Sequence, residues 1–240
     1  MEQKQQQKEV VEYYDSIAST YDDSRFGNSY GRFIDAEERK VLNQLIDIKA
    51  DELRLDMACG TGRLTNYATH GLDASSEMMA HAKERHPSVS FTQATANETG
   101  FPDGMFDVVY SFHLLMHLDK TTIGEIFKEV HRILKPGGRF IFDIPSKKRR
   151  QLLHHKQASW HGGTHLTVSE VEMLARGDFG PEEVSAKELF DVKRTFGIMM
   201  LPLHRLPESM RKSLLRIDYS MANGWMKEYS SYVVCELVKR

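Results

Sequence analysis

The sequence predicts an α/β fold in which a mostly parallel sheet carries helices on both faces. Between residues 53 and 146, short apolar segments alternate with amphipathic ones, and such alternation indicates right-handed βαβ units. A glycine-rich turn at residues 58–62 follows the first apolar segment. Parallel sheets bind ligands at the carboxyl ends of their strands, so this turn is the first candidate for a binding site.

The first 50 residues predict a helical cap that precedes the sheet. Apolar residues recur at steps of three and four over residues 10–21, which is typical of one helix face. A second helix is expected over residues 33–48, after a glycine-containing break at 27–31.

The core elements are expected in regular succession. Strands are predicted at residues 53–57, 70–73, 89–91, 106–110 and 139–144, and helices at 75–85 and 121–134. Only eleven positions separate Gly62 from Asp73. Because a helix rises about 1.5 Å per residue, we expect a stunted helix after Gly62 and a very short second strand.

Beyond residue 146 the pattern predicts less. Helices are expected at residues 167–176 and 207–219, mixed strand and loop at 184–200, and a last strand at 230–238. We expect one domain, with a cap at 1–50, a ligand-binding core at 51–146 and a segment at 147–240 that completes the site. Residues 147–150 (KKRR) are expected to begin a solvated helix.

The composition excludes some classes of protein and indicates the cellular compartment of the chain. The net charge of −2 argues against a nucleic-acid binder. Two cysteines far apart in sequence, Cys59 and Cys235, suit a reducing compartment. Residues 1–8 lack the apolar core of a signal peptide, and the longest apolar stretch, 106–118, is too short and polar to span a membrane. A cytoplasmic protein is therefore expected.

Residues 55–62 (LDMACGTG) resemble motif I of the class I methyltransferases, which use S-adenosyl-L-methionine. An acid precedes the glycines and the third glycine of the dinucleotide fingerprint is missing, which disfavours a nicotinamide dehydrogenase. Further segments at residues 71–75, 101–111, 117–118 and 134–139 follow in the order of that family. The resemblance covers residues 53–146, is nearest to the small-molecule subgroup with the quinone and sterol enzymes, and implies a Rossmann-like, doubly wound sheet of seven strands.

The resemblance also implies which residues hold the cofactor. Gly60 and Gly62 would let the loop pass under its amino-acid portion and ribose, and Asp56 would lie near its ammonium group. Asp73 would accept hydrogen bonds from both ribose hydroxyls, although an N-cap of the helix at 75–85 is an alternative role. Further cofactor contacts are expected at Ala58, Cys59, Ala74, Thr95, Ala96, Ser111, Tyr14 and Tyr21. Thr95 stands where the family often has an acid, so it would accept the adenine amino group more weakly.

Catalysis by such an enzyme depends more on the positioning of its two substrates than on reactive side chains. The enzyme must hold a nucleophile in line with an activated methyl group, and a base is needed only if the acceptor loses a proton. The candidates for this base are His113, His117 and Tyr21, with Tyr14 beside them. The structural alternatives are a turn residue for His117 and a core residue for Tyr14.

Several alternatives stay open. No metal site is expected, because His154, His155, His161 and His165 lack a regular ligand spacing. The leading hypothesis is a methyltransferase with a small-molecule acceptor, whose pocket lies between the N-terminal helices and residues 145–221. An RNA-modifying methyltransferase that uses the basic run 147–150, and a non-catalytic cofactor-binding partner subunit, are the alternatives. The basic run could also form a rim that attracts an anionic acceptor.

Overall fold

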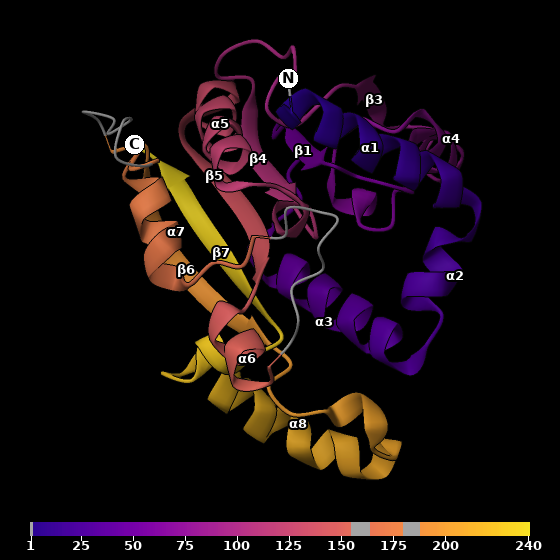
Figure 1. The fold of residues 1–240 in the computed structure, drawn as a ribbon, viewed down its shortest axis with the longest axis vertical. Helices are drawn as coiled ribbons and strands as arrows, with labels where there is room; N and C mark the ends of the chain where they lie inside the picture. Colours follow the sequence, from indigo (N-terminus) through magenta and orange to yellow (C-terminus); the bar gives the residue numbers. More distant parts are fainter. Residues whose placement is uncertain (1, 155–163, 180–187) are drawn as a thin grey trace.

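The sheet has seven strands in the order β3-β2-β1-β4-β5-β7-β6, and a cap of helices stands on one side of it (Figure 1). The computed structural model describes residues 2–154, 164–179 and 188–240. The strands are β1 (Arg54–Met57), β2 (His70–Asp73), β3 (Ser90–Gln93), β4 (Phe106–Ser111), β5 (Leu134–Pro145), β6 (Phe190–Ile198) and β7 (Tyr232–Lys239).

Between residues 53 and 146 the helices alternate with the strands along the chain, as the sequence pattern predicted. They are α1 (Glu2–Ile17), α2 (Tyr21–Phe26), α3 (Ser29–Leu45), α4 (Ser76–Arg85), α5 (Lys120–Ile133), α6 (Lys147–Leu152), α7 (Val168–Ala175) and α8 (Glu208–Asn223). Strands β1 to β5 pair in parallel, whereas β7 is antiparallel to both β5 and β6. The expectation of a mostly parallel, seven-stranded sheet is confirmed.

Each face of the sheet has its own apolar core. On one face, α5 and α7 pack on the strands, with fully buried side chains such as Phe127 and Phe140. On the other face, α3 packs through Ile34 and Leu42, together with the partly buried side of α8. Because helices cover both faces of the sheet, a ligand can reach the sheet at the ends of its strands.

The segment between Gly62 and Asp73 is as short as expected. It holds one 3₁₀ turn, Thr65–Tyr67, and then the four-residue strand β2. No α-helical turn forms there, and the chain reaches the start of β2 within eight residues of Gly62. The prediction of a stunted helix and strand is confirmed.

Several boundaries differ from the prediction. The second helix, expected over residues 33–48 after a break at 27–31, is α3 over Ser29–Leu45 and so includes Gly31. The first helix, expected over residues 10–21, begins at Glu2 and ends at Ile17, and Tyr21 opens the separate helix α2. Strand β5, expected over 139–144, begins already at Leu134, because Leu134 pairs with Phe106 of β4 before a shift in register. Local periodicity does not report such pairing across strands.

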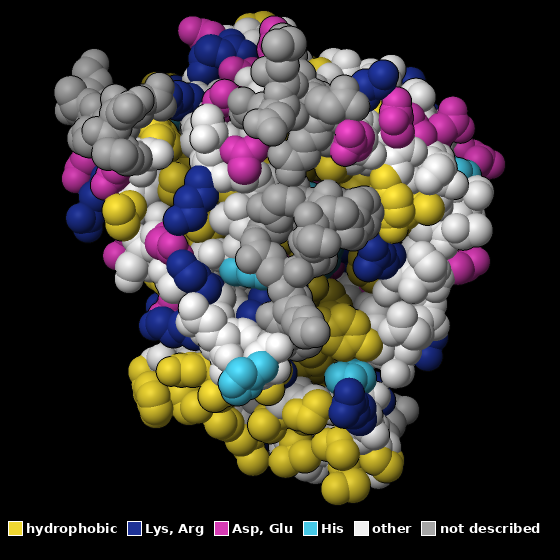
Figure 2. Space-filling model, viewed as in Figure 1, with side chains coloured by type: hydrophobic (Ala, Val, Ile, Leu, Met, Phe, Trp, Pro, Cys, Tyr) yellow, Lys and Arg dark blue, Asp and Glu magenta, His cyan; other side chains and the backbone are white. Residues whose placement is uncertain are grey.

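Helix α8 carries apolar side chains on more than its sheet-facing side. Leu214 and Leu215 pack against the second core, whereas Met210, Ile217 and the following Trp225 are exposed. Figure 2 shows hydrophobic side chains gathered at the end of the molecule that α8 forms. No helix among the described residues is long and apolar enough to cross a bilayer.

Candidate functional site

The loop after β1 has a backbone that suits glycine. Ala58, Gly60 and Gly62 have positive φ angles of 60°, 54° and 80°, a region that side chains disfavour. A Cβ atom on Gly60 would meet nothing within 4 Å, so open space lies beside this residue. A Cβ atom on Gly62 would lie 3.0 Å from the Ala82 Cα atom, which means that α4 packs directly on the loop.

Asp73 ends β2 and holds the glycine loop in place. Its Oδ2 accepts a hydrogen bond from the Gly60 amide at 2.7 Å, and its Oδ1 accepts one from the Ser75 amide at 2.9 Å. The N-cap of α4 is Ser75, whose hydroxyl accepts from the Met78 amide at 3.1 Å. Burial raises the pKa of Asp73. The Asp73 carboxylate therefore supports the glycine loop. It is not needed as the N-cap of α4, because Ser75 has that role.

A cavity lies at the carboxyl ends of the parallel strands, where such sheets place ligands. Its walls come from α1, the glycine loop, the end of β2, residues 94–97 and the segment that follows β4. Ten of the predicted site residues line it, namely Tyr14, Tyr21, Ala58, Gly60, Asp73, Ala74, Thr95, Ala96, His113 and His117.

Helix α1 contributes the wall opposite the sheet. The Tyr14 hydroxyl lies 3.0 Å from Nε2 of His117, and the rings of Tyr14 and Tyr21 meet edge to face with centroids 5.9 Å apart. Burial raises the pKa of Tyr14 well above its usual range, so this phenol stays protonated at neutral pH. Tyr14 is thus a cavity residue, and not only a core one.

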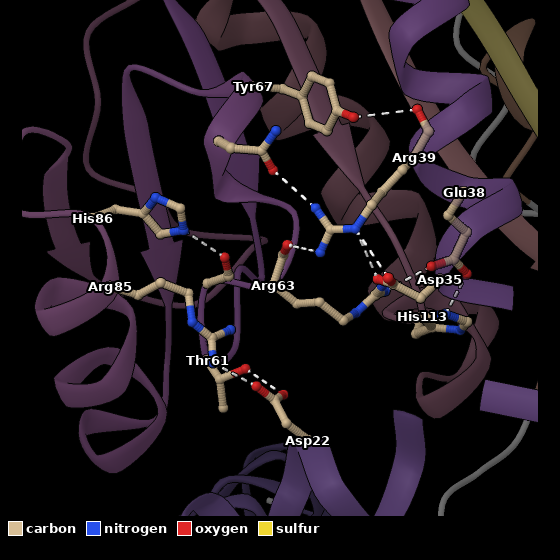
Figure 3. A network of polar contacts seen from close by, with 12 residues as sticks. Asp22, Asp35, Glu38, Arg39, Thr61, Arg63, Tyr67, Arg85, His86 and His113 are labelled. Carbon is tan, nitrogen blue, oxygen red and sulfur yellow. Dashed lines mark hydrogen bonds and ion pairs between the residues drawn. The ribbon is translucent and has the colours of Figure 1, made fainter. Parts of the chain in front are cut away.

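Two aspartates fasten the cap to the core. Asp15 of α1 accepts a hydrogen bond from the Ser75 hydroxyl at 2.5 Å, at the start of α4. Asp22 of α2 accepts one from the Thr61 hydroxyl at 2.7 Å and pairs with Arg85 at 2.7 Å, as Figure 3 shows. Both contacts join the N-terminal helices to the elements that surround the glycine loop.

A partly buried network of charges lies behind the loop (Figure 3). Arg63 pairs with Asp35 at 2.6 Å and with Glu38 at 2.7 Å, and Arg39 pairs with Asp35 at 3.0 Å. The second oxygen of Glu38 lies 2.6 Å from Nε2 of His113. The network connects α3 with the residue that follows the glycine loop and with the segment after β4.

His113 is held by two carboxylates and has a rare backbone conformation. Its φ is 61°, and its amide donates a 2.6 Å hydrogen bond to Oδ1 of Asp143. Burial opposes the charge on His113, but Glu38 and Asp143 outweigh it and raise the pKa of the imidazole. Burial also opposes the charge on Glu38, but His113 and Arg63 lower the pKa of that carboxyl.

The sequence pattern of the methyltransferase domain family matches residues 55–142. This span contains the glycine loop, Asp73 and the segment after β4, which form the cavity walls that face α1. The chain contains a class I methyltransferase domain. Domains of this kind use S-adenosylmethionine.

Relatives agree with this assignment. An uncharacterized methyltransferase of Synechocystis sp. is 36% identical over 92 residues, which cover 36% of this chain and 43% of the relative. A demethylmenaquinone methyltransferase of Chlorobaculum tepidum is 30% identical over 148 residues, covering 57% of this chain and 59% of the relative. The matches span about half the length of these curated relatives.

The fold is also that of solved methyltransferases. The crystal structure of a SAM-dependent methyltransferase from Thermotoga maritima superposes with a TM-score of 0.71 at 18% identity, over 96% of this chain and 99% of that one. At this identity the likeness concerns the fold, and it includes the N-terminal cap because nearly the whole chain is covered.

Four predicted site residues of the methyltransferase domain do not line the cavity, namely Asp56, Cys59, Gly62 and Ser111. Asp56 is buried and accepts a 2.6 Å hydrogen bond from the Thr65 hydroxyl. Burial raises its pKa to about 7. Gly62 serves the packing of α4, and the Ser111 hydroxyl is buried in the core.

Three residues of the charge network, Glu38, Arg63 and Asp143, were not predicted from the sequence. A signal existed for Glu38, because it falls at helical spacing between the apolar residues Ile34 and Leu42 of the buried face. Asp143 likewise interrupts a buried apolar strand. An acid in such a position is rarely left without a partner.

The basic run at residues 147–150 is more than a solvated helix start. Lys147 pairs with Glu170, Lys148 pairs with Glu228, and Arg149 donates to the carbonyl of Met200 at 2.8 Å. Residues 147–152 do form the short helix α6, but three of its four cations have local partners. Of the four histidines, His155 and His161 lie outside the described residues.

Proposed function

We propose that this chain is an S-adenosylmethionine-dependent methyltransferase that acts on a small molecule. One observation carries the proposal: the open side of Gly60 and the carboxylate of Asp73 border the same cavity at the carboxyl ends of β1 and β2. A ligand there can approach the loop backbone closely and still reach a carboxylate.

The residues fit the cofactor chemically. Each oxygen of Asp73 accepts one amide hydrogen bond, and a carboxylate oxygen has a further lone pair for a ribose hydroxyl. Apolar side chains such as Leu72, Met78 and Ile126 line the cavity and suit a flat purine. Thr95 offers a hydroxyl where an acid is common. Asp56 would act on the ammonium group from behind the loop, through its charge or through water.

Proton handling is assigned to Tyr14 and His117. When bound, the cofactor supplies a methyl group already activated on sulfur. Tyr14 and His117 line the cavity and are hydrogen-bonded to each other. An acceptor that must lose a proton would give it to the Tyr14 oxygen, while Tyr14 passes its own proton to Nε2 of His117. His113 suits this role less well, because both of its ring nitrogens face carboxylates.

The acceptor would lie between the cap, residues 1–50, and the segment 147–240. The ring of His113 supports this, because it contacts Phe26 of α2 at 6.3 Å and Tyr232 of β7 at 5.1 Å between centroids. A small-molecule acceptor is supported by the demethylmenaquinone methyltransferase among the relatives. A reducing, cytoplasmic location stays a prediction, supported by the buried and unpaired state of Cys59 and Cys235.

Calorimetry with S-adenosylmethionine and S-adenosylhomocysteine tests the proposal. We expect one binding site, and Asp73→Ala should weaken binding by about tenfold or more, since it removes a buried charge-assisted acceptor. Asp51→Asn, at an exposed position, is the matched control and should bind as the native protein does. Transfer of a labelled methyl group into a cell extract then identifies the acceptor. A folded protein with no affinity for either nucleoside would refute the proposal.

A further inference from the structure

Three side chains from distant parts of the chain converge beside the cavity. Glu38 comes from α3, His113 follows β4 and Asp143 lies near the end of β5. One ligand atom from each lies within 4.8 Å of the others. Glu38 and Asp143 are only 1% and 2% exposed, whereas His113 lines the cavity. Among the residues that the structure describes, no other group of three could hold a metal ion in this way.

The converging atoms are buried, and Glu38 Oε1, His113 Nε2 and Asp143 Oδ2 lack hydrogen bonds of regular geometry. Glu38 Oε1 lies 2.6 Å from His113 Nε2 and forms an ion pair with it when the imidazole is protonated. Asp143 Oδ2 is 3.5 Å from His113 Nδ1, which is too long for a hydrogen bond. Buried polar atoms rarely stay unpaired. Since Glu38 Oε1 and His113 Nε2 are only 2.6 Å apart, an ion shared by the three side chains would lie beside this pair, toward Asp143 Oδ2.

The other atoms of the same side chains are firmly oriented. Arg63 holds the second oxygen of Glu38 at 2.7 Å, and the His113 amide holds the second oxygen of Asp143 at 2.6 Å. The hydrogen bond to Asp143 also stabilises the left-handed backbone of His113. Contacts of this kind fix the direction of metal ligands in known sites.

We propose that Glu38, His113 and Asp143 bind one divalent cation that accepts both nitrogen and oxygen ligands, such as Zn²⁺ or Mn²⁺. Bonds of about 2.1 Å in tetrahedral geometry put ligand atoms about 3.4 Å apart. Glu38 Oε1 therefore has to move away from His113 Nε2, which is 2.6 Å from it, and the widest separation among the three atoms, at most 4.8 Å, has to shrink. The set has no thiolate, which argues against copper(I), and its imidazole disfavours Mg²⁺.

The competing occupant is a proton on His113. An imidazolium between the two carboxylates would offset part of their charge, and the nearby Arg63 favours a smaller added charge than that of a divalent ion. A proton, however, leaves Asp143 Oδ2, which is 3.5 Å from His113 Nδ1, without a hydrogen bond. Binding measurements separate the two occupants.

The site would lie at the wall of the cavity, because His113 is the ligand that lines it. A fourth ligand from the cavity side would be water or an oxygen of the methyl acceptor. This consequence, unlike the metal site itself, rests on the proposed function. It predicts an acceptor with a hydroxyl, carboxylate or phosphate oxygen, which a cation can orient and polarise.

Direct metal binding tests the site without any cofactor or acceptor. Protein freed of metal with a chelator is titrated with Mn²⁺, followed by the loss of the free-ion electron paramagnetic resonance signal, and with Zn²⁺ by calorimetry. We expect one equivalent to bind. Asp143→Asn, which keeps the oxygen that accepts from the His113 amide, should weaken binding by about tenfold or more. Asp35→Asn, in the same Arg63 network but outside the ligand set, should bind as the native protein does.

Each outcome of these titrations either supports or overturns the metal site. Stoichiometric binding that Asp143→Asn loses and Asp35→Asn keeps supports the site, and Glu38→Gln should repeat the loss if Asp143→Asn fails to fold. If native protein binds neither Mn²⁺ nor Zn²⁺, the metal site is overturned and the proton on His113 is favoured. The metal site is also overturned if Asp143→Asn and Glu38→Gln both bind metal as the native protein does. Because cofactor affinity is measured separately with chelator present, failure of the metal site and failure of the methyltransferase proposal are distinguishable.

Discussion

Tyr14 and His117 are 103 residues apart in sequence, yet the Tyr14 hydroxyl lies 3.0 Å from Nε2 of His117. This contact closes α1 over the cavity from one side, and the bond between Asp15 and Ser75 closes it from the other. The binding properties of the domain should therefore depend on contacts made by its cap.

Tyr14→Phe should open the cap without unfolding the core. The loss of one hydrogen bond costs about 1 kcal/mol, so affinity for S-adenosylhomocysteine should fall about fivefold. Amides of α1 should exchange faster with deuterium while those of β4 do not change. Tyr219→Phe, at an exposed tyrosine of α8, is the control. If the α1 amides of Tyr14→Phe exchange as slowly as those of the native protein, other contacts hold the cap.

Gly60→Ala should affect cofactor binding more than stability. Gly60 and Gly137 both have positive φ, of 54° and 74°, and a Cβ atom would meet nothing within 4 Å at either position. Both alanine variants should therefore lose about 1–2 kcal/mol of unfolding free energy. Only Gly60→Ala should also weaken nucleoside binding, because its Cβ enters the cavity. Equal affinities in the two variants would place the cofactor elsewhere.

Asp56 should make stability depend on pH. Burial raises its pKa from 3.8 to about 7, so folding favours its protonated form. Its stabilising contribution is complete below pH 3.8 and is lost as the pH rises through about 7. The total amounts to about 4 kcal/mol at most. Urea denaturation of Asp56→Asn between pH 4.5 and 8 should lack this part of the slope, and an unchanged slope would contradict the shift.

Binding of the cofactor should release a proton near pH 6.5. A cationic ammonium group close to Asp56 would lower the pKa of this carboxyl from about 7, so part of the population gives up its proton. Calorimetry in two buffers with different ionisation enthalpies measures the number released. Asp56→Asn should abolish the difference between buffers. Proton release that persists in this variant would assign it to another group.

The core of the domain could be predicted because its signals are local. The run from Leu55 to Gly62 and the short step to Asp73 fix a strand, a turn and a second strand within a few residues. The family resemblance implied a mostly parallel sheet of seven strands, but the antiparallel position of β7 between β5 and β6 was not predicted, because periodicity alone does not determine strand order.

The polar network could not be predicted from local signals. Glu38, His113 and Asp143 lie on three elements that only the finished fold brings together. The same holds for Asp15 and Asp22, which appear in the sequence as ordinary acids of an exposed helix. For these residues, the partner decides the role, and the partner is distant in sequence.

The order of the strands has a consequence for biosynthesis. Strand β6 pairs with β7 alone, and β7 follows it in the chain after α8. At about 5–20 residues per second, β6 leaves the ribosome seconds before its partner, with both hydrogen-bonding edges bare. Nascent chains stalled in this interval should therefore bind chaperones more readily than chains released after Lys239.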